Sequence, residues 1–416
     1  METNSKQASY RRSMVILFLT MFIVMVGFGV IMPILPFFAE SMGASATQLG
    51  LLFASYSVVQ FIFSPIWGQM SDRVGRKPVI LVGLVGFGIS FMLFGMATSL
   101  WMLFAARILG GILSAATLPT VMAYIADTTS AEQRGSGMGV LGAAMGMGVT
   151  FGPVIGGFLG ERSPSLPFFF SGFLALAVAV FAFFLLPESL SQARRQKAKA
   201  IRRRRSSMVE VLTALSGPLG FLLVLAFLAS FASANLEGTF ALFSEVHLGF
   251  GESEMGLVFG VMGVVMALTQ GLMVGRFINR WGEERMIQVG LISSALGFFS
   301  LLTTSSLIGV LIVMAVMGLG NAAMRPAVNS LASKLVAPDE QGSAMGVVNS
   351  YNSLGRIFGP IVGGVLFDTL GYQWPYIFGG LVFMLTFGGS FFLFNRNRMV
   401  LNTTASYPLE DNAASD

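Results

Sequence analysis

Cysteine is absent from this 416-residue chain, and histidine occurs once, at His247. These absences exclude disulfides, thiolate catalysis and metal sites built from cysteine or from clustered histidine. The sequence also lacks the Gly-x4-Gly-Lys-Ser/Thr loop that would bind ATP, and no cleavable signal-peptide pattern precedes the first apolar run. We therefore expect no cofactor, no metal and no enzymatic activity.

Charged residues are scarce as well. They make up 11% of the chain, whereas hydrophobic residues make up 54%, too large an excess for a soluble protein of this length. Runs of about 20 apolar residues are long enough to cross a bilayer as helices, and they lack the alternation of barrel strands. Twelve such runs are found, at 13–38, 46–70, 78–97, 100–126, 134–160, 166–187, 216–246, 252–278, 283–303, 306–333, 340–366 and 373–395. The sequence predicts an all-α, multi-pass membrane protein with 12 transmembrane helices.

The basic residues indicate how these helices are oriented. With both termini on one side, 21 of the 25 Lys and Arg residues fall on that side, including those of the 188–215 stretch. The loops on the opposite side carry a single basic residue, Arg162, alongside six acids: Glu40, Glu161, Glu245, Glu252, Glu254 and Asp368. The positive-inside rule then places both termini in the cytoplasm. The basic excess therefore indicates membrane topology and not a nucleic-acid partner.

The chain contains an internal repeat at an offset of 207 residues. The matching segments include Phe151-Gly152-Pro153 with Phe358-Gly359-Pro360, and Gly156-Gly157 with Gly363-Gly364. A parallel duplication of this kind predicts two six-helix bundles. We assign a first bundle to 1–190, a basic cytoplasmic linker to 191–215, a second bundle to 216–398 and a polar, disordered cytoplasmic tail to 399–416. The linker run Arg202–Arg205 is expected to lie near anionic lipid headgroups.

Four local patterns resemble one known family. They are Gly29-x3-Pro33-x2-Pro36, Gly68-x3-Asp72-Arg73-x-Gly75-Arg76-Lys77-Pro78, Arg107 followed by Gly110-Gly111, and Gly148-x3-Gly152-Pro153-x2-Gly156-Gly157. The chain resembles, over nearly its whole length, the twelve-helix drug–proton antiporters of the major facilitator superfamily. The turn pattern is typical of the superfamily and the last pattern of its antiporters. The resemblance implies the major facilitator fold, proton-coupled transport and a monomer.

The turn between the second and third spans has a physical role of its own. Gly68 and Gly75 permit close packing and a tight turn, and Asp72 and Arg73 mark the membrane boundary. The resemblance implies that this segment closes the cytoplasmic side and that Arg76 pairs with Asp127 at the end of span four.

In the second copy of this turn the signs are reversed. Asn279 replaces Asp72, Glu283 replaces Arg76, and Lys334 occupies the position of Asp127. A pair within the second copy is possible, although its equivalence to the first is open. A topogenic loop without a gating role is the alternative for both copies.

Small residues line span five and its copy. Gly148, Gly152, Gly156 and Gly157 allow helix backbones to approach closely in lipid, and Pro153 and Pro360 remove a helix hydrogen bond. We expect these residues, with Gly359, to form a deformable interface between the halves. Tight packing alone is the alternative.

Ionisable groups inside spans indicate the chemistry. Glu237 is the one acid well inside a span, and a carboxyl there can alternate between a proton-bound and a substrate-bound state. The resemblance implies a part in proton coupling for Arg107, while Arg325 and Arg356 are open between functional and structural roles. Candidate substrate contacts are Tyr56, Gln60, Met145, Asn235, Phe240, Asn321, Arg325 and Asn352.

These features predict export of amphipathic small molecules across the cytoplasmic membrane in exchange for protons, by alternating access. The expected partners are that substrate, protons and the lipid bilayer. Three arginines against one acid within the spans is an unusual balance for a pump dedicated to cationic dyes. A narrow exporter of tetracycline, chloramphenicol or a metabolite is the alternative, and a membrane receptor or scaffold that transports nothing is a more distant one.

Overall fold

The computed structural model describes residues 2–193, 195–196, 213–217, 219–337 and 340–405. Over these residues the chain is helical, and 12 helices are long and apolar enough to cross a membrane. They coincide with the predicted spans to within a few residues at each end, so the predicted fold class is confirmed. The basic run Arg202–Arg205 lies outside the described residues.

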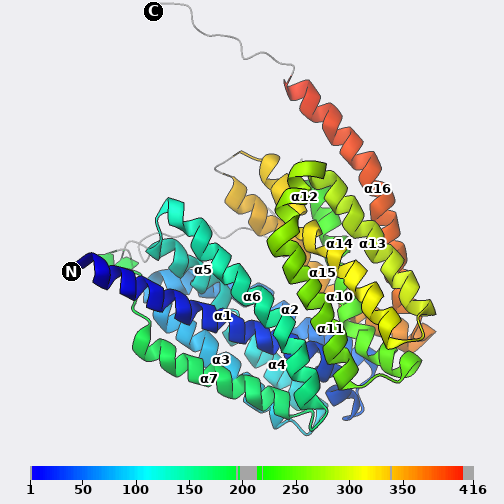
Figure 1. Ribbon diagram of the computed structural model, residues 1–416, viewed down its shortest axis with the longest axis horizontal. Helices are drawn as coiled ribbons and strands as arrows, with labels where there is room; N and C mark the ends of the chain where they lie inside the picture. Colours follow the sequence, from blue (N-terminus) through cyan, green and yellow to red (C-terminus); the bar gives the residue numbers. More distant parts are fainter. Residues whose placement is uncertain (1, 194, 197–212, 218, 338–339, 406–416) are drawn as a thin grey trace, which may run out of the picture.

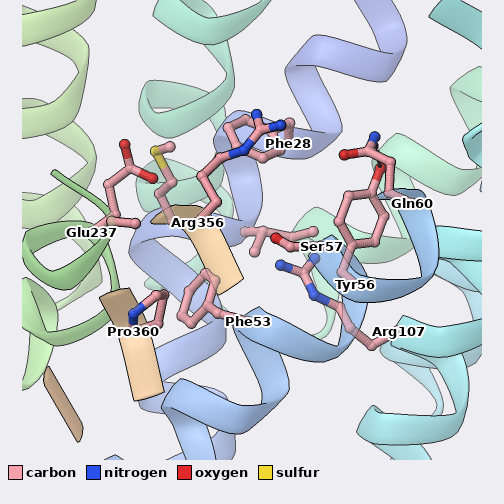
Figure 2. Close-up of a pocket in the computed structure, with 12 residues that line it drawn as sticks. Phe28, Phe53, Tyr56, Ser57, Gln60, Arg107, Glu237, Arg356 and Pro360 are labelled. Carbon is pink, nitrogen blue, oxygen red and sulfur yellow. Dashed lines mark hydrogen bonds between the residues drawn. The ribbon is translucent and has the colours of Figure 1, made fainter. Parts of the chain in front are cut away.

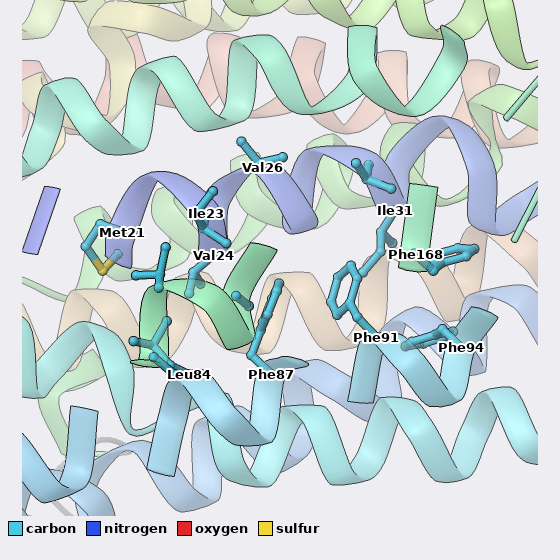
Figure 3. Packing of buried hydrophobic residues seen from close by; sticks show 14 of the residues in the cluster. Met21, Ile23, Val24, Val26, Ile31, Leu84, Phe87, Phe91, Phe94 and Phe168 are labelled. Carbon is cyan, nitrogen blue, oxygen red and sulfur yellow. The ribbon is translucent and has the colours of Figure 1, made fainter. Parts of the chain in front are cut away.

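The first six spans form the N-terminal bundle, which occupies the left half of Figure 1. Span four is divided into two helices, α4 and α5. The helices are α1 (Glu2–Glu40), α2 (Ala46–Val74), α3 (Arg76–Gly95), α4 (Leu100–Ser114), α5 (Thr117–Thr128), α6 (Ala131–Gly160) and α7 (Leu166–Leu185). A cluster of aromatic rings holds α3 and α7 together in the core of this bundle (Figure 3), where Phe94 stacks on Phe168 with ring centroids 5.3 Å apart.

The second six spans form the C-terminal bundle, on the right of Figure 1. After a short 3-10 turn η1 (Ala214–Ser216), its helices are α10 (Gly220–Leu248), α11 (Glu252–Leu268), α12 (Val274–Trp281), α13 (Glu283–Thr303), α14 (Leu307–Lys334), α15 (Gln341–Leu370) and α16 (Trp374–Ala405). A π-helical turn η2 (Thr269–Met273) joins α11 to α12 within span eight. The helix α16 extends to Ala405, so the first part of the predicted disordered tail is helical instead, and residues 406–416 are outside the described part.

The helices have a basic end and an acidic end. The basic end carries Arg73, Arg76, Lys77, Arg134 and Lys334. The acidic end carries Glu40, Glu161, Glu245, Glu252 and Asp368. Both α1 and α16 extend past the bundles on the basic side (Figure 1).

The glycines of span five face two different partners. A Cβ added to Gly148, Gly152 or Gly156 would meet backbone atoms of α1 in the same bundle, at 2.6, 2.5 and 3.2 Å respectively. A Cβ on Gly157 would instead lie 2.8 Å from Gly256 Cα of α11, in the other bundle. The expectation that all four glycines lie between the halves is therefore corrected, because their spacing of four residues places the first three on one face of α6.

The repeat reproduces this arrangement in α15. A Cβ on Gly359 would lie 2.3 Å from a carbonyl oxygen of α10 in its own bundle, whereas one on Gly364 would lie 2.2 Å from the Ala46 carbonyl oxygen of α2. Close to Gly364, the backbone of Pro360 contacts Gly50 of α2, whose added Cβ would lie 2.1 Å from the Pro360 carbonyl oxygen. Two pairs of helices, α6 with α11 and α2 with α15, thus join the bundles.

These contacts between bundles belong to the acidic side of the molecule. There Asp368 of α15 accepts hydrogen bonds from the Ala46 and Thr47 amides at the start of α2, at 3.1 and 2.8 Å. Toward the basic end, by contrast, a Cβ added to Gly139 of α6 or Gly275 of α12 would meet nothing within 4 Å. Figure 1 shows the two bundles diverging in the same direction. The structure is therefore closed at the acidic end and open at the basic end.

Candidate substrate and proton site

A cavity lies between the two bundles and is lined by both of them (Figure 2). About 500 Å³ of space at this place is free of protein atoms, and part of that space is open to solvent. The N-terminal bundle contributes Phe28, Ile31, Met32, Phe53, Tyr56, Ser57, Gln60 and Arg107, and the C-terminal bundle contributes Ala234, Glu237, Arg356 and Pro360. The lining is largely apolar and aromatic, with a few polar and charged groups, as in sites for amphipathic molecules.

The structure brings both predicted proton-coupling residues and two of the predicted substrate contacts together here, beside the predicted gating residue Pro360. Tyr56 and Gln60 lie one turn apart on α2, and the Gln60 amide donates to the Tyr56 hydroxyl at 3.3 Å. Arg107 reaches the cavity from α4 and Glu237 from α10, in opposite bundles. In Figure 2, Glu237 lies on one side of the view and Tyr56, Gln60 and Arg107 lie on the other, while the Arg356 guanidinium reaches the middle, beside Phe28.

Arg107 is held against aromatic rings and not by an acid. Its guanidinium carbon lies 4.7 Å from the ring centroid of Tyr56 and 5.4 Å from that of Phe53. The residue is 3% exposed, and its Nε is buried without a hydrogen-bond partner. Among the residues that the structure describes, no carboxylate forms an ion pair with it.

Glu237 has cationic neighbours on its own side of the cavity. Arg356, and more weakly Arg325, interact electrostatically with its carboxyl group. The Arg356 guanidinium also donates to Ser353 at 3.4 Å, and its Nε is buried without a partner. Sequence reasoning identified Arg356 as a buried cation but left its role open, and the structure places it at the wall of the cavity.

Several predicted substrate contacts lie elsewhere. Phe240 is fully buried and packs edge-to-face on Phe259 of α11, with ring centroids 5.7 Å apart. Asn235 is also fully buried, and its amide donates to the Pro375 carbonyl at 2.7 Å. Met145 packs against the core of the N-terminal bundle. The structure therefore places these three side chains within the bundles and not in the cavity lining.

The remaining predicted contacts are in the C-terminal bundle but outside this lining. Asn321 accepts a hydrogen bond from Ser294 at 3.2 Å, and Asn352 donates to the Val348 carbonyl within its own helix at 3.1 Å. Arg325 is exposed and acts on Glu237 only through its charge. Sequence reasoning missed Phe28 and Phe53 as lining residues, since an apolar position facing a cavity has the same pattern as one facing lipid.

The turn at the basic end forms the ion pair that the resemblance implies. Arg76 Nε lies 2.9 Å from Asp127 Oδ2, and a second Arg76 nitrogen lies 2.7 Å from Asp72 Oδ1. Gly75 has a φ of +123°, in the region that favours glycine, and it begins the tight turn. Glu188 then accepts from the Arg76 amide at 2.9 Å, so the end of span six stabilises the start of α3.

The second copy forms a pair of reversed sign. Lys334 and Ser330 both donate to Glu283 at the start of α13. The positions match Asp127 and Arg76 of the first copy after the 207-residue offset. Each half therefore has an ion pair that joins its third span to its fourth, whichever member carries the positive charge.

The comparisons with known proteins follow this geometry. The sequence matches the family model described as the Major Facilitator Superfamily over residues 17–307 and 222–406. The chain belongs to the major facilitator superfamily. It is a multi-pass membrane protein of a transporter family, and membership implies a small-molecule substrate.

Two relatives within the superfamily cover most of the chain. Multidrug resistance protein 2 of Bacillus subtilis (strain 168) is 35% identical over 375 residues, which cover 90% of this chain and 93% of the relative. The class B tetracycline resistance protein of Escherichia coli is 32% identical, with 82% of this chain and 85% of the relative covered.

Solved structures show the same fold. The human organic anion transporter MFSD10 (TETRAN) superposes with a TM-score of 0.66 at 25% identity, covering 92% of this chain and 99% of that one. The nucleoside transporter NupG superposes with a TM-score of 0.76 at 14% identity, over 92% of this chain and 99% of that one. The NupG similarity concerns the fold alone.

Proposed function

We propose that this superfamily member exports amphipathic small molecules across the cytoplasmic membrane in exchange for protons. The observation that carries the proposal is the position of Glu237, which supplies the carboxyl group of a cavity lined by both bundles. A carboxyl in that position can hold either a proton or a substrate group, so that the two compete for one site. The names of the relatives, multidrug resistance and tetracycline resistance proteins, support export of drug-like compounds.

The cycle follows from the contacts between the bundles. In the structure the cavity is open toward the basic end, which the positive-inside rule assigns to the cytoplasm together with both termini. Substrate enters from that side, and the acidic-end contacts of Gly157 and Gly364 then separate while the basic end closes. A proton that enters from outside displaces the substrate at Glu237 and returns the monomer to its starting state. Moving one charge across 100 mV supplies about 2.3 kcal/mol, enough to support a useful gradient.

The remaining roles follow from position. Arg107 contributes a fixed positive charge to the proton-coupling site, and Tyr56 and Gln60 contact the substrate. Arg76 with Asp72 and Asp127 stabilises the turn that closes the basic end. Asn321, Arg325 and Asn352 are proposed as contacts only for other states of the cycle, because they lie outside the cavity lining of this one.

Proton flux in everted membrane vesicles tests the proposal. Ethidium, a fluoroquinolone, chloramphenicol and tetracycline are added in turn to energised vesicles, and loss of the pH gradient is followed. Responses to several unrelated compounds support a multidrug exporter, whereas a response to one alone supports the narrow exporter that the tetracycline-resistance relatives favour.

A matched pair of carboxyl variants provides the control. Glu237→Gln should abolish proton flux while expression is retained. Glu254→Gln removes a carboxyl whose hydrogen bond, among the described residues, is with the Gly251 amide of its own bundle, at 3.0 Å, and should leave flux intact. Full flux in Glu237→Gln would refute the proton-coupling role, and the absence of flux with every compound would refute the proposal for these substrates.

A further inference from the structure

The cavity contains a buried cation without a counter-charge. Only 3% of Arg107 is exposed. Within the described ranges, its guanidinium forms no hydrogen bond and no ion pair. Burying a charge is costly unless an opposite charge or hydrogen-bond acceptors compensate it.

The aromatic rings offset only part of this cost. Phe53 and Tyr56 lie within 5.4 Å of the guanidinium carbon, a separation at which a ring face attracts a cation. They cannot accept the hydrogen bonds of the guanidinium N–H groups, and the Nε remains without an acceptor. A planar guanidinium stacked on a ring is also held in a fixed orientation, which prepares it to bind a carboxylate through two parallel hydrogen bonds.

The second arginine of the cavity is in a different situation. Arg356 comes from the same bundle as Glu237, whose carboxylate acts on it electrostatically, as does the like charge of Arg325. Arg107 comes from the opposite bundle and has no such neighbour (Figure 2). The charged residues of the lining are two arginines and one glutamate, so one positive charge is unmatched, and Arg107 is the arginine whose own bundle supplies no carboxyl group to the lining.

We propose that Arg107 is the binding residue for an ionised acidic group on the substrate, so that the cavity selects amphipathic compounds that carry a carboxylate or similar anion on an aromatic body. This inference rests on the proposed function and names the substrate class of the same site. The apolar body lies against Phe28, Phe53 and Met32. Glu237, on the other side, stays available for the proton or for the donor-bearing end of the substrate.

A matched series of fluorescent ligands tests the charge preference. Dansylglycine is acidic, dansylglycinamide is its neutral analogue, and dansylcadaverine is cationic. Binding to the purified full chain is measured without a proton gradient, by energy transfer from its four tryptophans. The acid should bind at least about tenfold more tightly than the amide, the difference expected for a charge-assisted hydrogen-bonded pair, and the amine should bind most weakly.

Variants assign the preference to one residue. Arg107→Gln should bind the acid and the amide equally, while its affinity for the amide stays close to that of the unmodified chain. Arg107→Lys keeps the charge without the fork of donors and should retain a reduced preference for the acid. Arg162→Gln is the control, since Arg162 also lies over a ring, 5.2 Å from the Phe158 centroid, but outside the cavity.

Several outcomes would overturn the inference. They are equal binding of acid and amide to the unmodified chain, a preference that survives Arg107→Gln, and the absence of binding by all three ligands. Proton-driven export of the fluoroquinolone, which carries a carboxylate, is measured in parallel. Export with no acid preference would refute only the anion site, whereas the absence of export with the acid preference intact would refute the proposed function and leave the anion site standing.

Discussion

The contact between Asp368 and α2 stabilises the state that is closed at the acidic end. Weakening this contact should therefore shift the population toward the state that is closed at the basic end. Asp368 binds two backbone amides across the bundle interface, at 3.1 and 2.8 Å, and these amides belong to the first turn of α2, where a helix terminus favours an anion. Asp368→Asn removes the charge and one of the two acceptor oxygens. Hydrogen bonds to charged groups contribute about 1.5–3 kcal/mol, and the solvent exposure of Asp368 favours the lower figure. A loss of about 1.5 kcal/mol would shift the equilibrium about tenfold away from the state closed at the acidic end.

Spin-label distance measurements can follow this shift. The chain has no cysteine, so cysteines introduced at Gly139 and Gly275 would be the sole labelling sites. Both positions face open space near the basic end, in different bundles. We expect the long distance between labels to dominate in the otherwise unmodified chain and a shorter one to grow in Asp368→Asn. An unchanged distribution, or an equal shift in Glu254→Gln, would refute the reasoning.

Two further predictions concern packing and the turn. Gly157→Ala should hinder closure of the acidic end and slow transport, because the new Cβ would lie 2.7 Å from the Glu252 carbonyl oxygen. Gly388→Ala is the control: its new Cβ would have no atom within 4 Å, so this variant should transport normally in the same vesicle assay. Arg76→Gln should lower the free energy of unfolding in detergent by about 3 kcal/mol or more, since the Arg76 side chain is 8% exposed. Lys334→Gln should lower it by less than about 1 kcal/mol, because the Lys334 side chain is 61% exposed. Equal losses in the two ion-pair variants would contradict this ranking.

The sequence predicted the fold because its signals are local. Apolar runs of sufficient length and the 207-residue repeat were enough to identify twelve spans in two halves, and the charge reversal at Glu283 and Lys334 indicated a pair that the structure contains. The Arg76–Asp127 pair came from the resemblance and is also present. Each of these two ion pairs joins residues of the same half of the chain.

The residues of the cavity were predicted less well. Helical spacing gives the direction of a side chain around its helix axis but not what lies in that direction. Tyr56 and Gln60, four residues apart, share a face and both line the cavity. Phe240 is three residues from Glu237, which rotates it about 60° around the helix axis. That rotation is enough to turn Phe240 toward α11 and away from the cavity.

Contacts between the halves were beyond sequence reasoning altogether. Asp368 and Ala46 are 322 residues apart, and neither belongs to the repeated motifs. Their contact depends on how far the two bundles have rotated against each other. The same holds for Gly157, which the spacing could not separate from Gly148 and Gly156 without knowing which helix covers each face.

Competition between substrate and proton at Glu237 is the central claim, and proton release on binding tests it most directly. A compound exported in the vesicle assay is added to the purified chain in weakly buffered detergent solution containing a pH indicator. We expect binding to release protons from the unmodified chain and none from Glu237→Gln, although that variant still binds the compound. Equal release from Glu237→Gln, or binding to the unmodified chain without any release, would contradict the account.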